Sequence, residues 1–181
     1  MYEVEVKIKT PHAEMKKDLI ESGAVFLGTE EQKDTYFNSP WRDFAKTDEA
    51  LRIRLVNGKG EVTYKGKKID TVSKTRTEYN SSVDADAMKE ILLALGYFVS
   101  GEVNKRRESY RWGDFTIGFD DVEGLGEFIE VEADLRDGAD KSKIQNEVRR
   151  IFEFLGKYGL TESDSVTTSY LEMVLAKAEK K

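Results

Sequence analysis

The sequence contains no cysteine and a single histidine, His12. Without cysteine the chain has no disulfide framework and no thiolate to serve as a nucleophile or metal ligand. With one histidine it cannot build a metal site from several imidazoles. His12 follows Pro11 at a predicted helix start, where we expect it on the surface. Reactive chemistry must therefore come from carboxylates, lysines and arginines.

Proline and long apolar runs are also scarce. Only two prolines and 14 scattered glycines occur, so no flexible linker divides the 181 residues. We expect one domain over residues 1–176, followed by a charged tail at 177–181. The longest aliphatic run, residues 91–95, is far shorter than a membrane span. We therefore expect neither secretion nor membrane insertion, and a cytoplasmic protein.

The charge balance is acidic. Lys and Arg total 29 against 35 Asp and Glu, which gives a formal net charge of −6. Such a chain is a poor candidate for nucleic-acid binding, which needs a basic face. No G-x-x-x-x-G-K-[ST] sequence occurs, so a P-loop is excluded as the means of binding phosphate. Any anion site must be a local cluster of cations.

Alternation of apolar and polar residues predicts about eight strands, enough to close a small barrel. The segments are residues 2–9, 26–37, 50–56, 61–67, 74–83, 97–112, 115–120 and 128–135, with Asn57-Gly58 as a hairpin signal. Helical periodicity appears in residues 13–22, 84–95, 140–156 and 164–180. We predict an α+β fold, an eight-stranded antiparallel β-barrel with helices packed outside.

The polar face of these strands is almost wholly charged. Because side chains alternate across a strand, Glu3, Glu5 and Lys7 share one face. An ordinary explanation is a one-sided sheet whose charged face meets water. The predicted helices favour a different explanation, because they need an apolar surface to pack on. If the apolar faces of the strands meet the helices, the charged faces must point into the barrel. Further pairs on one face are Arg52 and Arg54, Lys65 and Lys67, Arg76 and Glu78, Lys105 and Arg107, and Glu130 and Glu132.

A charged interior requires both signs of charge together with a ligand, because unpaired buried ions are costly. Several arginines and lysines suit a polyphosphate with about four negative charges. Clustered carboxylates suit Mg²⁺ or Mn²⁺, which prefer oxygen ligands. The pattern predicts metal-assisted phosphoryl transfer or hydrolysis, in which charge neutralisation and alignment supply most of the catalysis.

The segment Glu3-Val4-Glu5-Val6-Lys7 resembles the E-x-E-x-K motif of the CYTH superfamily, the triphosphate tunnel metalloenzymes. This family includes class IV adenylyl cyclases and thiamine triphosphatases. E-x-E-x-K alone occurs by chance in exposed strands, whereas the whole ordered set of segments is specific. The resemblance continues through residues 34–37, 50–54, 64–66, 105–107, 119–122, 124–132 and 169–170, and residues 42–48 resemble the proteins grouped with class IV cyclases.

The resemblance implies roles for individual side chains. It implies that Mg²⁺ or Mn²⁺ binds to Glu3, Glu5, Asp120, Glu130 and Glu132. It implies that the triphosphate binds to Lys7, Arg52, Arg54, Lys65, Arg76, Lys105 and Arg107. Catalysis is expected to depend most directly on Glu3, Glu5, Lys7, Lys105 and Arg107.

The favoured reaction is conversion of ATP to cAMP and pyrophosphate. Hydrolysis of thiamine triphosphate, tripolyphosphate or a nucleoside triphosphate is the alternative, and a noncatalytic polyphosphate or nucleotide binder is a second one. The expected partner is thus a small triphosphate, with neither nucleic acid nor membrane. A homodimer is expected only from the general frequency of dimers.

Overall fold

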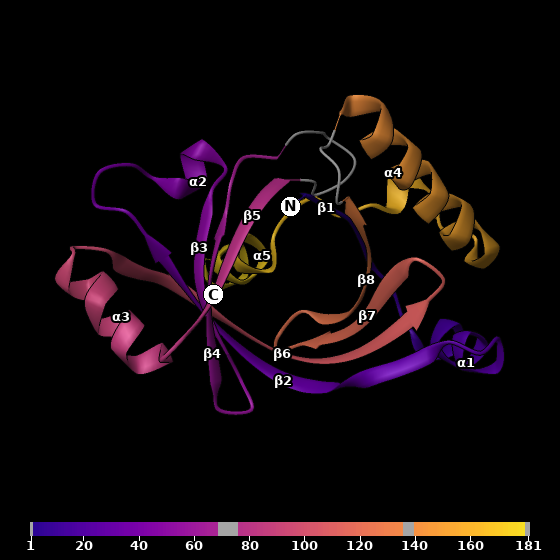
Figure 1. The fold of residues 1–181 in the computed structure, drawn as a ribbon, viewed down its shortest axis with the longest axis horizontal. Coiled ribbons are helices and arrows are strands. Elements are labelled where there is room, and N and C mark those ends of the chain that lie inside the picture. The colour runs from indigo at the N-terminus through magenta and orange to yellow at the C-terminus, as the bar shows by residue number, and fades with distance from the viewer. Residues whose placement is uncertain (1, 69–75, 136–139, 180–181) are drawn as a thin grey trace.

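The computed structural model describes residues 2–68, 76–135 and 140–179 (Figure 1). Eight antiparallel strands form a closed barrel in the order β1-β5-β4-β3-β2-β6-β7-β8. This confirms the predicted fold class. The strands are β1 (Tyr2–Lys9), β2 (Val25–Asn38), β3 (Ala50–Val56), β4 (Lys59–Lys65), β5 (Arg76–Val83), β6 (Phe98–Trp112), β7 (Phe115–Val122) and β8 (Gly126–Leu135).

The β3–β4 hairpin has a turn of only two residues. Asn57 and Gly58 both have positive φ, 49° and 77°, which suits the primed two-residue turns that match strand twist. Val56 and Lys59 therefore pair directly, and β4 begins and ends two residues earlier than the alternation predicts. The first two residues of the predicted fifth strand, 74–75, lie outside the described residues.

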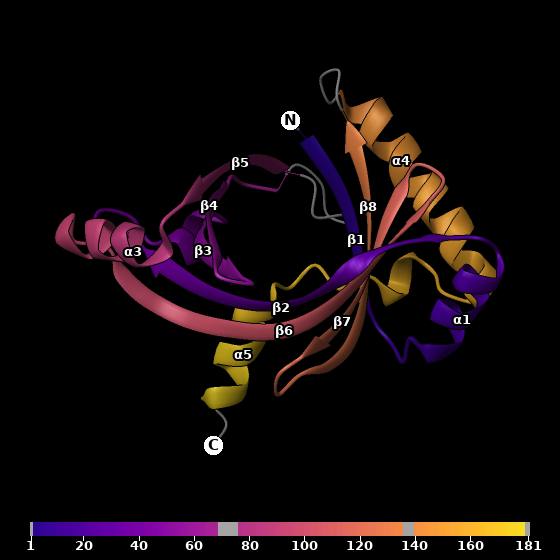
Figure 2. The same ribbon diagram turned by 60° about the horizontal axis from the view of Figure 1, so that its bottom comes forward.

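The described residues form five α-helices, of which three cover the outer face of the barrel and two border its cavity. They are α1 (Ala13–Glu21), α2 (Phe44–Thr47), α3 (Ala85–Ala94), α4 (Lys141–Leu155) and α5 (Tyr170–Ala178). Figure 2 shows α4 alongside β1 and β8, while α3 packs on β3 and β4. In the part of the chain that the structure describes, each helix is too short or too polar to cross a membrane.

The outer faces of the strands are apolar and the inner faces charged. Val4, Val6 and Ile8 of β1 are at most 2% exposed and belong to one core cluster with residues of α1 and α4. On the opposite side, Ile53 of β3 packs with Leu92 of α3. Since apolar side chains face the helices, the alternate positions face the interior. The inward direction of the charges, predicted from the helices, is confirmed.

Helix α5 begins later than predicted, at Tyr170 rather than near residue 164. Before it, Ser165 bridges to Ile8, and the Val166 amide donates to the Lys7 carbonyl at 2.7 Å. Ser169 then forms a capping box with Glu172, which fixes the helix start. The helix begins at one end of the barrel and runs outward to Ala178 (Figure 2).

Gly101 of β6 makes room for this helix. A Cβ atom at residue 101 would lie 2.6 Å from Leu171 Cδ1, so a larger residue would require the Leu171 side chain to shift. Lys177 Nζ also donates to the Gly124 carbonyl, at 2.5 Å. Since α5 ends at Ala178, residues 177–178 of the predicted tail belong to the last helix.

Candidate active site

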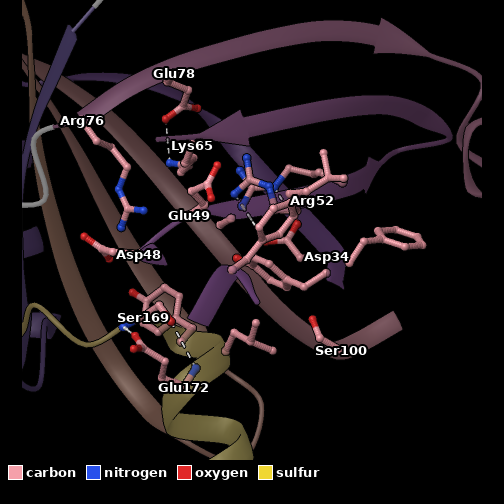
Figure 3. A pocket seen from close by; sticks show the side chains of 18 of the residues that line it. Asp34, Asp48, Glu49, Arg52, Lys65, Arg76, Glu78, Ser100, Ser169 and Glu172 are labelled. Carbon is pink, nitrogen blue, oxygen red and sulfur yellow. Dashed lines mark hydrogen bonds and ion pairs between the residues drawn. The ribbon is translucent and has the colours of Figure 1, made fainter. Parts of the chain in front are cut away.

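The barrel encloses a cavity of about 370 Å³ (Figure 3). Its walls combine charged side chains from the strands with residues of α2 and α5. The cavity brings together most of the predicted site residues, namely Glu5, Arg52, Arg54, Lys65, Arg76, Lys105, Arg107, Glu130 and Glu132. Lys7 and Asp120 are fully buried beside it. For Glu3, only the backbone in β1 is described.

Three carboxylates gather on the β1 and β8 side. Oxygens of Glu5, Glu130 and Glu132 lie within 4.8 Å of one another, and Glu5 is directly opposite Glu132 in the sheet. Burial raises the pKa of Glu132 to about 7, and the charges of Glu5 and Glu130 add to the rise. Like charges so placed are stable only with a proton or a cation between them. This all-oxygen donor set fits Mg²⁺ or Mn²⁺.

Arg107 is the main counter-ion of this side. It donates to both oxygens of Asp120, at 2.6 and 2.7 Å, and also pairs with Glu130 and Glu132. Gly118 lets the guanidinium lie across β7, because a Cβ atom there would be 3.0 Å from Arg107 Nε. One arginine is therefore shared by Asp120, Glu130 and Glu132.

Asp120 lies among cations rather than within the group of three carboxylates. Lys105 Nζ contacts it at 2.9 Å, and the Tyr170 hydroxyl donates to it at 2.9 Å. Burial alone would raise the pKa of Asp120, but Arg107 and Lys105 outweigh burial and lower it. The Asp120 carboxylate is therefore ionised and already paired. Its predicted role as a metal ligand stays a prediction.

Arg52 and Arg54 dominate the β2 and β3 side. Arg54 donates to both oxygens of Asp34, each at 2.7 Å, and Arg52 approaches the same carboxylate at 3.7 Å. Burial would raise the pKa of Asp34, yet the two arginines lower it. Here a single carboxylate faces two arginines, the reverse of the arrangement around Arg107.

Lys65 and Arg76 extend the cationic wall along β4 and β5. Lys65 Nζ pairs with Glu78 at 2.7 Å, whereas Arg76 donates to the Gly66 carbonyl at 3.4 Å. In Figure 3 the Arg76 guanidinium projects into the cavity toward Asp48. Together with Arg52 and Arg54, these two cations could surround a polyphosphate.

Lys7 points away from the centre of the cavity. Its Nζ donates to the Thr168 carbonyl at 2.5 Å and lies 4.1 Å from the centroid of the Tyr170 ring. Tyr170 belongs to an apolar cluster with Val103, Val122 and Phe128 that closes this end of the barrel. Whether Lys7 contacts a triphosphate stays a prediction.

Several residues of the cavity are absent from the site predicted from the sequence. Asp34 lies on the inward face of β2 and is 2% exposed. Strand alternation combined with the need of Arg54 for a partner was a signal that could have found it. Asp48 and Glu49 follow α2, where no alternation exists to guide a prediction. Glu49 accepts two hydrogen bonds from Arg42, which help to lower its pKa to about 2.

The cavity also has an apolar part. It is formed by Phe44 of α2 and by Leu171 and Leu175 of α5. Phe37 and Leu51 also border the cavity, but they pack with Leu92 in the outer core. Leu175 is 38% exposed, which places it near solvent. A purely inorganic polyphosphate gains nothing from such a surface, whereas an organic group attached to it would bury apolar area there.

Fold and cavity thus define a barrel protein whose internal cavity is lined by both carboxylates and cations. A family model described as the CYTH domain matches residues 1–170, and the chain belongs to this family.

Relatives support the assignment over almost the full chain. A Methanocaldococcus jannaschii protein, provisionally named an adenylate cyclase, is 39% identical over 175 residues, covering 96% of this chain and 98% of the relative. Adenylate cyclase CyaB of Aeromonas hydrophila is 29% identical over 148 residues, 81% of this chain and 73% of the relative. A solved structure of a Pyrococcus horikoshii protein has a TM-score of 0.86, with 38% identity, and covers 97% of this chain and 99% of that one.

Proposed function

We propose that this chain is a metal-dependent adenylyl cyclase that converts ATP to cAMP and pyrophosphate. The observation that carries the proposal is a single cavity that holds three clustered carboxylates, a wall of cations and an apolar part. These match a divalent metal, a triphosphate and an organic group in turn. Two relatives that carry the name adenylate cyclase support the choice of reaction.

Glu5, Glu130 and Glu132 would hold the metal. A bound divalent ion would supply charge neutralisation and polarise oxygen atoms of the triphosphate. Arg107 already contacts Glu130 and Glu132. With Glu130 and Glu132 engaged by a metal, the Arg107 guanidinium would be able to donate to a phosphate oxygen instead. The side chains would thereby switch from pairing with one another to pairing with ligands.

Arg52, Arg54, Lys65 and Arg76 would bind the outgoing part of the triphosphate. In cyclisation the ribose 3′-oxygen bonds to the α-phosphorus, and the bond from that phosphorus to the bridging oxygen breaks. Pyrophosphate leaves with the electron pair, while the hydroxyl proton passes to solvent or to a carboxylate. Fixed cations around the leaving group stabilise the charge that develops on it. The substrate must be bent so that the 3′-oxygen reaches the phosphorus, which is a demand on positioning.

The same side chains would also support hydrolysis if water reached the phosphate in place of the 3′-hydroxyl. The substrate would then be ATP, thiamine triphosphate or tripolyphosphate, and the terminal phosphate would be attacked. A noncatalytic binder is less well supported, because clustered carboxylates only weaken the binding of an anion unless a metal lies between them.

Product analysis tests the proposal. Purified protein is incubated with ATP and Mg²⁺ or Mn²⁺, and cAMP and pyrophosphate are resolved from ADP and orthophosphate. We expect cAMP and pyrophosphate in equal amounts, with no product when the metal is chelated. Glu102→Gln, an exposed carboxylate change on β6, serves as a control that keeps wild-type activity. Orthophosphate without cAMP would overturn cyclisation in favour of hydrolysis, and metal-dependent ATP binding without turnover would favour the binder.

A further inference from the structure

A second group of ionisable residues lies on the outer face of β7 and β8. Asp121 and Glu127 are directly opposite each other in the sheet. Asp120, the neighbour of Asp121, points into the barrel, so alternation turns Asp121 outward. The two carboxylates are 53% and 43% exposed. They are thus separate from the carboxylates of the cavity.

His12 covers this carboxylate pair. The sequence prediction of a surface histidine is wrong, because the residue is only 5% exposed and its ring packs 5.3 Å from that of Phe119. Its Nε2 lies 3.5 Å from Asp121 Oδ1, and its Nδ1 lies 3.5 Å from Glu127 Oε1. Within the described residues, neither ring nitrogen has a hydrogen-bond partner. A buried ring without a hydrogen-bond partner, aimed at two carboxylates, indicates that a positive charge is missing from this group.

The carboxylates themselves also need a cation. Like charges directly opposite in a sheet destabilise it. Arg106 faces Asp121 from β6, but its guanidinium contacts Glu31 at 3.6 Å and Glu108 at 3.2 Å. A neutral imidazole carries one N–H and cannot donate to both sides. Two candidates remain for the missing charge, which are a proton on His12 and a metal ion.

We propose that His12, Asp121 and Glu127 form a binding site for a divalent metal of the Zn²⁺ class. One donor atom from each residue can be chosen so that all three lie within 4.8 Å of one another. Tetrahedral zinc with bonds of about 2.1 Å separates its ligands by about 3.4 Å. One ion binds only one ring nitrogen, so one of the two 3.5 Å contacts matches this separation, and the other carboxylate must turn toward the same nitrogen. The exposed carboxylates can turn to complete the set. A mixed nitrogen and oxygen set favours Zn²⁺, whereas Mg²⁺ prefers oxygen alone.

The single histidine makes the test specific. In long-range ¹H–¹⁵N NMR spectra of the whole chain, every imidazole signal belongs to His12. We expect Zn²⁺ to shift the signal of one ring nitrogen, with saturation at one equivalent. Mg²⁺ at the same concentration should leave both nitrogens unshifted, even where it binds in the cavity. The readout needs no enzymatic activity, so it does not depend on the proposed reaction.

Variants identify the other ligands. Asp121→Asn and Glu127→Gln should each lower the Zn²⁺ affinity, measured by the His12 shift, at least about 10-fold. Glu102→Gln removes an exposed carboxylate elsewhere and should bind Zn²⁺ as the wild type does. Circular dichroism verifies that each variant is folded. A His12 signal that responds to pH but not to Zn²⁺ would overturn the metal site in favour of a proton, and unchanged affinity in both variants would also overturn it.

Discussion

The two sides of the barrel interior arrange their charges in opposite ways. On the side of β6, β7 and β8, one arginine, Arg107, faces several carboxylates. On the side of β2 and β3, one carboxylate, Asp34, faces Arg52 and Arg54. The first arrangement is short of positive charge and the second of negative charge. A metal would supply the positive charge that the first side lacks, and a polyphosphate would supply the negative charge that the second side lacks.

Removal of Arg107 should have the largest effect. Arg107→Ala leaves Asp120, Glu130 and Glu132 buried without their main counter-ion, and we expect a loss of about 3–5 kcal/mol in unfolding free energy. Urea denaturation measures the change. Arg54→Ala is the matched control, with a smaller loss because Asp34 keeps Arg52. Equal losses in the two variants would contradict the difference between the sides.

Titration of Glu132 should give the next largest effect. Its folded-state pKa of about 7 lies above the ordinary value of 4.5, because burial and then Glu5 and Glu130 oppose ionisation. Between these values the folded state binds more protons, so stability must fall as pH rises from about 4.5 to 7. The shift corresponds to at most about 3 kcal/mol.

The Glu132→Gln variant isolates this effect from other carboxylates. It cannot ionise, so its stability relative to the wild type should rise over the same pH range and level off above pH 7. Urea denaturation at a series of pH values measures the difference. A difference that stays constant with pH would show that Glu132 titrates normally. Saturating Mg²⁺ should reduce the difference, since a bound cation favours the ionised form.

Glu5→Gln tests the carboxylate-rich side through activity. The change keeps the shape of the side chain but removes one charged metal ligand, and we expect turnover to fall about 100-fold while ATP still binds. The measurement is cAMP formation across a range of Mn²⁺ concentrations. Glu102→Gln is the charge-matched control. Unaltered metal-dependent activity would remove Glu5 from the site.

Arg54→Ala tests the cation-rich side through binding. The loss of one charge-assisted contact of about 1.5–2 kcal/mol should weaken triphosphate affinity roughly 10-fold to 30-fold. Isothermal titration with tripolyphosphate measures this in the absence of turnover. Arg149→Ala removes an exposed arginine of α4, 70% exposed, and should bind normally. Similar affinities for both variants would mean that Arg54 pairs with Asp34 and does not contact the triphosphate.

Strand alternation predicted the barrel and the inward direction of its charges. It succeeded because each strand of residues 2–9 and 50–56 keeps one strict period and the helices need the apolar face. Helical periodicity failed at residues 164–169, where the contacts of Ser165 and Val166 with β1 override it. Local pattern carries no information about such contacts between distant segments.

The sequence predicted many of the residues that line the candidate site, but not which of them contact one another. Strand alternation places Glu130, Glu132 and Arg107 inside the barrel, yet it does not show which carboxylate Arg107 contacts. The close approach of Arg107 to Gly118 depends on the register of β6 and β7. Similarly, the burial of His12 depends on how α1 lies over β7, which the sequence around Pro11 does not encode.

Leu175→Ala should have the smallest effect and would extend the comparison to the apolar part of the cavity. Loss of a half-exposed leucine contact of about 1 kcal/mol should weaken ATP binding about 5-fold. Tripolyphosphate lacks an organic group, so its affinity should be unchanged. Isothermal titration with both ligands measures the two constants, and Leu95→Ala, an exposed change at the end of α3, is the control. An equal loss for both ligands would mean that Leu175 positions α5 instead of contacting the organic group.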